Sequence, residues 1–342
     1  MVTLMAIFID GISSLDCYRF DSAAYDSARV AKRYARVFAS SNPSAAQLDA
    51  LLQTHRYFER PLHVLVSSNG FRRRKKGVSY RVASLPPRDS FLPIDDDIYI
   101  CSPGFMMARS ALALDFPTLI ALGYEITGAY RLRPASDQGF TAAPALMTPS
   151  RLDAFLSQSE FAGARKARHA LRFVSPNSAS PRETMLAILL SLPKAKGGYG
   201  LPLPQLNYEI EVSKADWRVA FGRRFFCDLF WPDSNLALEY DSDSFHAGAE
   251  KIAHDARRRN ALSSMGITVI TATRAQTATR FGLDQIAAQI ARGLGVRLRM
   301  ERVNRLAQEE LLKSLLHRCA MQRDPDKTTG GAKCLRLPRL AA

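Results

Sequence analysis

The stretch RFFCDLFWPDSNLALEYDSDSFH, residues 224–246, decides the fold of the C-terminal half of this chain. Two apolar runs, 225–231 and 236–240, flank Pro232-Asp233-Ser234-Asn235, which are residue types that favour turns. This pattern predicts a β-hairpin. If the turn is centred between residues 233 and 234, Asp228 lies directly opposite Glu239.

Strand alternation extends this prediction to the faces of the hairpin. Side chains of a strand point alternately to its two faces, so one face is expected to carry Phe226, Asp228, Phe230, Ala237, Glu239 and Asp241. Opposed side chains have Cβ atoms about 4.5–5.5 Å apart, and two carboxylates so close repel each other unless a cation or a proton lies between them. Mg²⁺ or Mn²⁺ prefers such oxygen ligands, so Asp228, Glu239 and Asp241 are predicted metal ligands. The alternative is that these acids border a solvated strand end.

The elements around the hairpin follow a regular order. Ser180-Pro181-Arg182-Glu183 is typical of a helix start, with an N-cap serine, a proline at the first position and a glutamate at the third. A strand is predicted at 208–212, before the hairpin. After it we predict a helix over 249–265, a buried strand over 267–271 and an amphipathic helix over 283–294. The predicted order is αβββαβα.

This order and three segments, SPRE, CDLFWPDSNLALEYDSDSFH and HDARRRNALSSMGITVITAT, resemble the PD-(D/E)XK (restriction endonuclease-like) superfamily. They are more closely similar to an uncharacterised group related to very-short-patch-repair (Vsr) endonucleases, and the resemblance covers residues 150–295. It implies a Mg²⁺- or Mn²⁺-dependent endonuclease acting on DNA in repair, defence or mobile-element biology. Its catalytic residues would be Glu183, Asp228, Glu239 and Asp241, and the last three would bind the metal.

The chain departs from the superfamily pattern at two positions. Asp241 stands where a lysine is expected two residues after the strand glutamate, and Ser242 stands where the relatives carry glycine. His246, Lys251 or Arg257 could supply the missing donor, and one or two members of the cluster Arg257-Arg258-Arg259 could face a phosphate. Without the lysine, the alternative is a non-catalytic DNA-binding or antitoxin-like regulator on a nuclease scaffold.

Glu183 has a structural explanation beside the catalytic one. A glutamate at the third helical position commonly bonds back to the N-cap residue and so stabilises the start of the helix. The sequence leaves both roles open.

The charge balance favours a nucleic-acid partner. The chain has 47 Lys and Arg against 32 Asp and Glu, a net charge of +15. Residues 291–342 hold 12 Lys and Arg and 5 Asp and Glu, a net of +7. Such charge attracts polyanions without regard to sequence. DNA is the expected partner and RNA the less favoured one, while a basic tail that serves only solubility is the alternative.

The length of 342 residues predicts more than one domain. We expect a smaller mixed α/β N-terminal domain over 1–149, a restriction endonuclease-like domain over 150–300, and a basic helix with a disordered tail over 301–342. The overall fold class is therefore mixed α/β.

The N-terminal region is predicted to contain strands at 63–67, 78–82 and 98–101, with a helix starting after Ser102. This layout resembles, in topology and a few residues, a region of AbiEi-type antitoxin proteins. The turn Arg72 to Lys76 carries five consecutive cations. It is the best candidate in this half for contacting phosphates, although cations at a sheet edge also serve solubility.

Several classes are disfavoured by what the sequence lacks. The five cysteines form no C-x-x-C pair, which argues against a disulfide framework or a zinc finger. The chain has no G-x(4)-G-K-[ST] loop, H-E-x-x-H pair or G-x-S-x-G elbow, so no nucleotide cofactor is expected. It also has no apolar run long enough for a membrane span and no convincing signal peptide. We therefore expect a cytoplasmic protein without a membrane partner.

Overall fold

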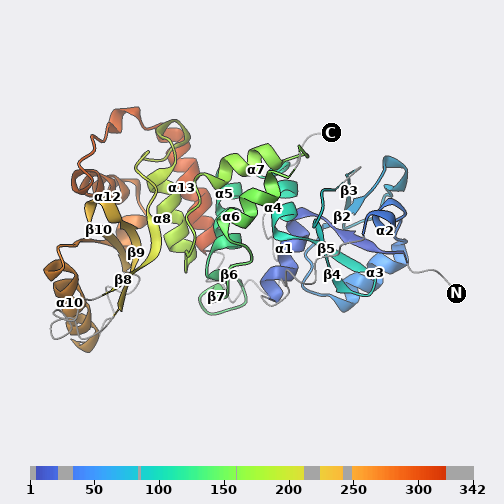
Figure 1. Ribbon diagram of the computed structural model, residues 1–342, viewed down its shortest axis with the longest axis horizontal. Helices are drawn as coiled ribbons and strands as arrows, with labels where there is room; N and C mark the ends of the chain where they lie inside the picture. Colours follow the sequence, from blue (N-terminus) through green and yellow to red (C-terminus); the bar gives the residue numbers. More distant parts are fainter. Residues whose placement is uncertain are drawn as a thin grey trace.

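The computed structural model describes residues 5–21, 34–83, 86–158, 160–211, 224–241 and 249–320, with the backbone alone at 249–255 and 320. The fold is mixed α/β, as expected. Figure 1 shows an elongated molecule with one sheet at each end and a layer of helices between them. No helix in these ranges is long and apolar enough to cross a membrane.

The N-terminal sheet has five strands in the order β3-β2-β1-β5-β4. Their bounds are β1 Ile7–Ile9, β2 Leu62–Val66, β3 Val78–Val82, β4 Phe91–Asp95 and β5 Ile98–Cys101. Three of these strands were predicted, and β3 and β5 have the predicted bounds. Strands β2 and β3, which flank the basic turn, pair in parallel. The chain that leaves the end of β2 must therefore cross back to the opposite end of the sheet before β3 begins.

Short helices accompany this sheet and precede the central layer. They are α1 Gly11–Phe20, α2 Ala35–Ala39, α3 Ala45–Thr54 and the 3₁₀ turn η3 Asn69–Phe71. Helix α3 begins at a capping box, in which the Ser44 hydroxyl accepts from the Gln47 amide and the Gln47 side chain accepts from the Ser44 amide.

The central layer consists of helices α4 Pro103–Ala111, α5 Phe116–Thr127, α6 Pro149–Leu156 and α7 Ala164–Leu171, with a small hairpin of β6 Tyr130–Leu132 and β7 Phe140–Ala142. Helices α6 and α7 pack against α4 and α5, although we assigned them to the second domain from the sequence. The main hydrophobic core runs without interruption from Ala6 to Cys319. It therefore includes parts of all three predicted segments.

The C-terminal sheet has four strands in the order β11-β10-β9-β8. Their bounds are β8 Gln205–Glu211, β9 Arg224–Trp231, β10 Leu236–Asp241 and β11 Thr268–Thr273. Strand β9 is antiparallel to both β8 and β10, while β11 runs parallel to β10. This sheet carries the predicted hairpin.

Helices cover both faces of the C-terminal sheet. They are α8 Pro181–Ser191, α10 Ala249–Ser264, α11 Arg274–Thr277 and α12 Arg280–Gly293, with 3₁₀ turns η4 Lys194–Lys196, η5 Pro232–Ser234 and η6 Met300–Arg302. Buried side chains of α8 and α12 pack with Leu229 and Leu236, whereas Leu262 of α10 packs on the other face against Phe230. The predicted order of elements is observed, with the short helix α11 added.

The register of the hairpin agrees with the prediction. Leu236 pairs with Trp231, Ala237 with Phe230, and Leu238 with Leu229. Asn235 closes the turn with φ 45°, the left-handed conformation that asparagine tolerates better than most residues. The pairing ends at Leu229 and Leu238, one position before the predicted pair of Asp228 with Glu239.

The predicted C-terminal helix is confirmed as α13, Arg305–Ala320, which packs against α8. Arg318 of α13 bonds the buried Glu125 of α5 at 2.7 Å, and Arg19 of α1 bonds the same carboxylate at 2.8 and 2.9 Å. A single carboxylate therefore joins the N-terminal, central and C-terminal helices. The predicted disorder of residues 321–342 lies outside the described residues.

Candidate functional site

Strand alternation breaks at one pair of residues in the middle of the sheet. On β9, Leu229 belongs to the core under α8, but Cys227 packs with Phe230 on the α10 face. On β8, Leu206 belongs to the core under α8, but Tyr208 stacks on Phe230 with ring centroids 4.8 Å apart. Between them lie Asn207 and Asp228.

The backbone of Asn207 accounts for this break. Its φ is 47°, so β8 turns locally out of the extended conformation. Pairing resumes in the same register on both sides, from Leu206 with Leu229 to Tyr208 with Cys227. No residue is inserted, yet the faces are exchanged beyond this point. The expectation that Phe226, Asp228 and Phe230 share one face is therefore wrong, and Phe226 is half exposed.

Asp228 bonds to the neighbouring strand through its side chain. The Tyr240 amide donates to Asp228 Oδ2 at 2.8 Å. The paired residues of β9 and β10 end at Leu229 and Leu238, so this carboxylate takes the place of a backbone partner where the strands separate. Within the described residues, the second oxygen of Asp228 has no hydrogen-bond partner, and it remains available to a ligand.

Glu183 lies at the start of α8, close to the same place. Its Oε1 accepts from the Ser180 hydroxyl at 2.8 Å, and its Oε2 accepts from the Ala179 amide at 2.8 Å. Asn207 Nδ2 also donates to Oε2, at 2.6 Å. The helix-capping role is thus observed, and the residue that breaks the strand alternation also orients this carboxylate.

Glu239 is held by an arginine from the helix that follows. Arg258 of α10 donates from Nη1 and Nη2 to the two oxygens of Glu239, both at 3.0 Å. It also donates to the carbonyl of Phe226. Since Phe226 is on β9 and Glu239 on β10, the guanidinium bridges the two strands where they separate. The side chains are 28% and 13% exposed.

The three carboxylates influence one another's ionisation. Burial raises the pKa of Glu183 to about 7, and the charge of Asp228 contributes to the same shift. Burial also raises the pKa of Glu239 to about 7, again with a contribution from Asp228, while Arg258 opposes the shift. Burial raises the pKa of Asp228 itself, against the Tyr240 amide and Arg258. Asp228 is the charge that both glutamates share.

The remaining residues predicted for the site are Asp241, the candidate donors and the arginine cluster. Asp241, at the end of β10, pairs with Thr273 of β11 and has interactions of its own. The side chains of His246 and Lys251 lie outside the described residues. Of the arginine cluster, Arg258 contacts the carboxylates, which the sequence could not select over Arg257.

The described residues contain no group of three or more His, Cys, Asp or Glu side chains arranged to hold a metal ion. Glu183 and Glu239 have both oxygens engaged by hydrogen bonds. A cation at this place would have to compete with Arg258 for Glu239.

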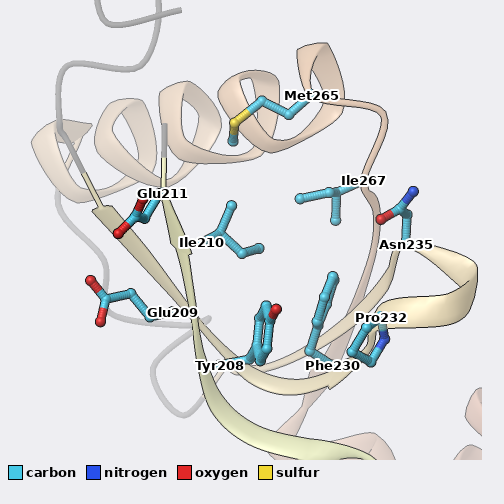
Figure 2. A pocket seen from close by; sticks show the side chains of 9 residues that line it. All are labelled: Tyr208, Glu209, Ile210, Glu211, Phe230, Pro232, Asn235, Met265 and Ile267. Carbon is cyan, nitrogen blue, oxygen red and sulfur yellow. The ribbon is translucent and has the colours of Figure 1, made fainter. Parts of the chain in front are cut away.

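An open cleft of about 870 Å³ lies on the α10 face of the sheet. Figure 2 shows Ile210, Phe230 and Ile267 pointing into the space beside the helix, with Met265 above them. Glu209 stands at its rim and is paired with Arg224 at 3.0 Å. The cleft is a consequence of the exchanged faces, because that exchange turns Tyr208 and Ile210 towards α10.

Comparison with known proteins gives relatives without an assigned activity. The chain is 32% identical over 129 residues to uncharacterized proteins from two strains of Mycobacterium tuberculosis. The match covers 37% of this chain and 42% of each relative, so the chain spans about two fifths of the length of the curated relatives it matches. No family model matches the chain. No solved structure matches it either.

Proposed function

We propose that this chain is a metal-dependent endonuclease that hydrolyses DNA phosphodiester bonds on a restriction endonuclease-like core. One observation carries the proposal. Glu183, Asp228 and Glu239 come from α8, β9 and β10, and the charge of Asp228 raises the pKa of both glutamates. Three converging carboxylates are costly for folding alone, and such clusters with perturbed pKa values are typical of functional sites.

The donor set fits a hard divalent cation. Its ligands are carboxylate oxygens, which suit Mg²⁺ or Mn²⁺. Asp228 has an oxygen without a partner in the described residues, and Glu239 would offer its oxygens once Arg258 moves away. A bound cation would relieve the repulsion from Asp228, which adds to burial in raising the pKa of Glu239 to about 7.

In this proposal Asp228 and Glu239 hold the metal, and Asp241 completes or orients its shell. A bound metal would supply an acidified water and stabilise the leaving oxygen of the phosphodiester. Glu183, held by Asn207 and by the cap of α8, keeps a negative charge beside Asp228 and can accept a proton near neutral pH. Arg258 supplies the positive charge that the strand lysine would otherwise supply, and it can bond a phosphate oxygen.

One observation favours a second function. Arg258 already pairs with both oxygens of Glu239, so this carboxylate has a counter-charge without a metal. A chain that kept the scaffold and lost the chemistry would be a DNA-binding or antitoxin-like regulator. In that case Arg258 is a permanent structural cation.

Nicking of supercoiled plasmid at low salt with Mg²⁺ or Mn²⁺ separates the two. The wild type is compared with Glu239→Ala and with Asp233→Ala, which removes an acid from the turn of the same hairpin. The proposal predicts that nicking is lost only in Glu239→Ala. DNA binding without nicking by the wild type in either metal would favour the regulator, and equal nicking by all three proteins would refute the site. A single-stranded RNA offered in parallel tests the less favoured substrate.

A further inference from the structure

The basic turn Arg72 to Lys76 has an organisation that the carboxylate site does not explain. It connects β2 to β3, and β3 is the edge strand of the N-terminal sheet. Arg72 has extended backbone angles, φ −72° and ψ 132°. The contacts of the five side chains divide the cations into two sets.

One set anchors the turn to the protein. Arg73 donates to Asn42 Oδ1 at 3.0 and 3.2 Å, and Lys75 donates to Asp49 of α3 at 2.8 Å. They fix the turn against the segment around α3.

The other set has no such anchors. Within the described residues, the side chains of Arg72, Arg74 and Lys76 make no hydrogen bond or ion pair, and all three residues are exposed. Arg60 adds a fourth cation, because its guanidinium lies against Gly77, where a Cβ atom would come within 3.0 Å of Nη1. Holding several unneutralised cations together costs electrostatic free energy, so the arrangement suits an anionic partner.

A cavity of about 480 Å³ lies among these cations, lined by residues 72–76 and by the first residues of β3. Tyr80 is one of them. Its side chain is buried, with 7% exposure, and its hydroxyl has no hydrogen-bond partner in the described part of the chain. A buried hydroxyl without a partner is costly unless a ligand or water supplies one. The cavity therefore offers an anion positive charge, and a lining residue with a buried hydroxyl that lacks a partner lies beside it.

We propose that Arg72, Arg74 and Lys76 bind consecutive backbone phosphates of a nucleic acid, with the Tyr80 hydroxyl donating to one of them. The assignment of nucleic acid as the partner rests on the proposed function. Residues 72 and 76 are at most about 13 Å apart along an extended chain, and one DNA strand presents a phosphate about every 3.4 Å of helix axis. Each of the three cations can therefore face a different phosphate of one strand.

The position of this turn makes it a separate contact from the carboxylate site. Figure 1 places β2 and β3 near one end of the long axis and β9 and β10 near the other. A nucleic acid held at both places would lie along the molecule. The turn would then supply affinity and orientation, and the carboxylates would supply chemistry.

Binding measured without cleavage tests this proposal. A fluorescent DNA duplex of about 30 base pairs is titrated in EDTA between about 50 and 200 mM salt, and anisotropy gives the salt dependence of affinity. The test variant is Arg72→Ala/Arg74→Ala/Lys76→Ala. The matched control, Arg151→Ala/Arg165→Ala/Arg172→Ala, removes the same charge from exposed positions of α6 and α7 and the residue after α7.

Each phosphate contact contributes about 0.9 to the slope of log affinity against log salt, so the test variant should lower that slope by about 2 to 3 and the control by less than 1. Tyr80→Phe should weaken binding about fivefold, the value of one net hydrogen bond, with the slope unchanged. Equal slopes for the test and control variants would overturn the proposal, as would a wild type that binds no DNA at about 50 mM salt.

Two further outcomes distinguish nucleic-acid binding by the turn from binding of any acidic partner, and from the endonuclease assignment. If polyglutamate competes as well as DNA of equal charge, the turn is a general site for acidic partners and the nucleic-acid assignment fails. If the test variant loses DNA affinity while the wild type never nicks plasmid, the turn binds nucleic acid as proposed and the endonuclease assignment alone fails.

Discussion

Replacing Arg258 by alanine tests how the carboxylates are held together without a metal. The change removes two hydrogen bonds of 3.0 Å to Glu239 and the link to the Phe226 carbonyl. Glu239 would then be a buried carboxylate beside Asp228 with no counter-charge. Alanine suits the interior of α10, so the helix itself should not be weakened.

The expected cost depends on pH. Removing one partner of a fully buried ion pair costs about 3–5 kcal/mol, and the partial exposure of this pair reduces the figure to about 2 kcal/mol at pH 8, where Glu239 is ionised. The pKa of Glu239 is raised to about 7 by burial and by Asp228. Below that value the carboxyl is neutral, and Arg258 makes only ordinary hydrogen bonds to it. The cost should then fall below about 1 kcal/mol at pH 5.5.

Thermal unfolding at the two pH values measures this difference. For 342 residues an unfolding entropy of about 0.7 kcal/mol/K converts 2 kcal/mol into a Tm lower by about 3 °C. Arg259→Ala, an exposed neighbour on the same helix, is the control and should leave Tm unchanged. If the site accepts a cation, Mn²⁺ should restore the Tm of Arg258→Ala at pH 8 and have no effect at pH 5.5. A Tm loss that is equal at both pH values would refute this account of Glu239.

Two other substitutions test the scaffold. Burial alone would raise the pKa of Glu125, but Arg19 and Arg318 lower it to about 2. The ionised carboxylate therefore adds about 3 kcal/mol to the free energy of unfolding above pH 4.5, and this contribution is lost as the pH falls towards 2. Glu125→Gln should lower Tm by about 4 °C at pH 7 and progressively less below pH 4.5, and a constant difference would contradict the ion-pair account. Gly163 has φ 89° and a Cβ there would come within 2.0 Å of the Ala108 carbonyl oxygen, whereas Gly266 has φ 76° and open space. Gly266→Ala should lower the free energy of unfolding by about 1–2 kcal/mol, and Gly163→Ala should lower it clearly more. Equal urea midpoints for the two variants would contradict this, because they would mean that the chain relieves the contact at Gly163.

The hairpin was predictable because its signals are local. Turn-forming residues separate two apolar runs, and these fix the register of Leu229 and Leu238 without knowledge of the rest of the chain. The signals of helix caps are local in the same way, and Ser180 is the N-cap of α8 as predicted. Strand β1 was missed because three apolar residues near the N-terminus have too little periodicity to distinguish a strand.

The details of the site depend on tertiary structure. The left-handed Asn207 exchanges the faces of two strands, and nothing in the pattern of β8 signals this, because asparagine occurs in many conformations. The choice of Arg258 over Arg257 depends on the rotation of α10 about its axis, which the sequence leaves open. Residue types were therefore predictable at this site, whereas their faces and partners were not.

The most direct test of the central claim is the rate of plasmid nicking by Asp228→Asn. The substitution keeps the size of the side chain and an oxygen that can accept from the Tyr240 amide, while it removes the charge that Glu183 and Glu239 share. The rate should fall by at least about a hundredfold in saturating Mn²⁺, with the circular dichroism spectrum and the DNA affinity unchanged. A nicking rate within about threefold of the wild type would contradict the claim that these carboxylates form the hydrolytic centre.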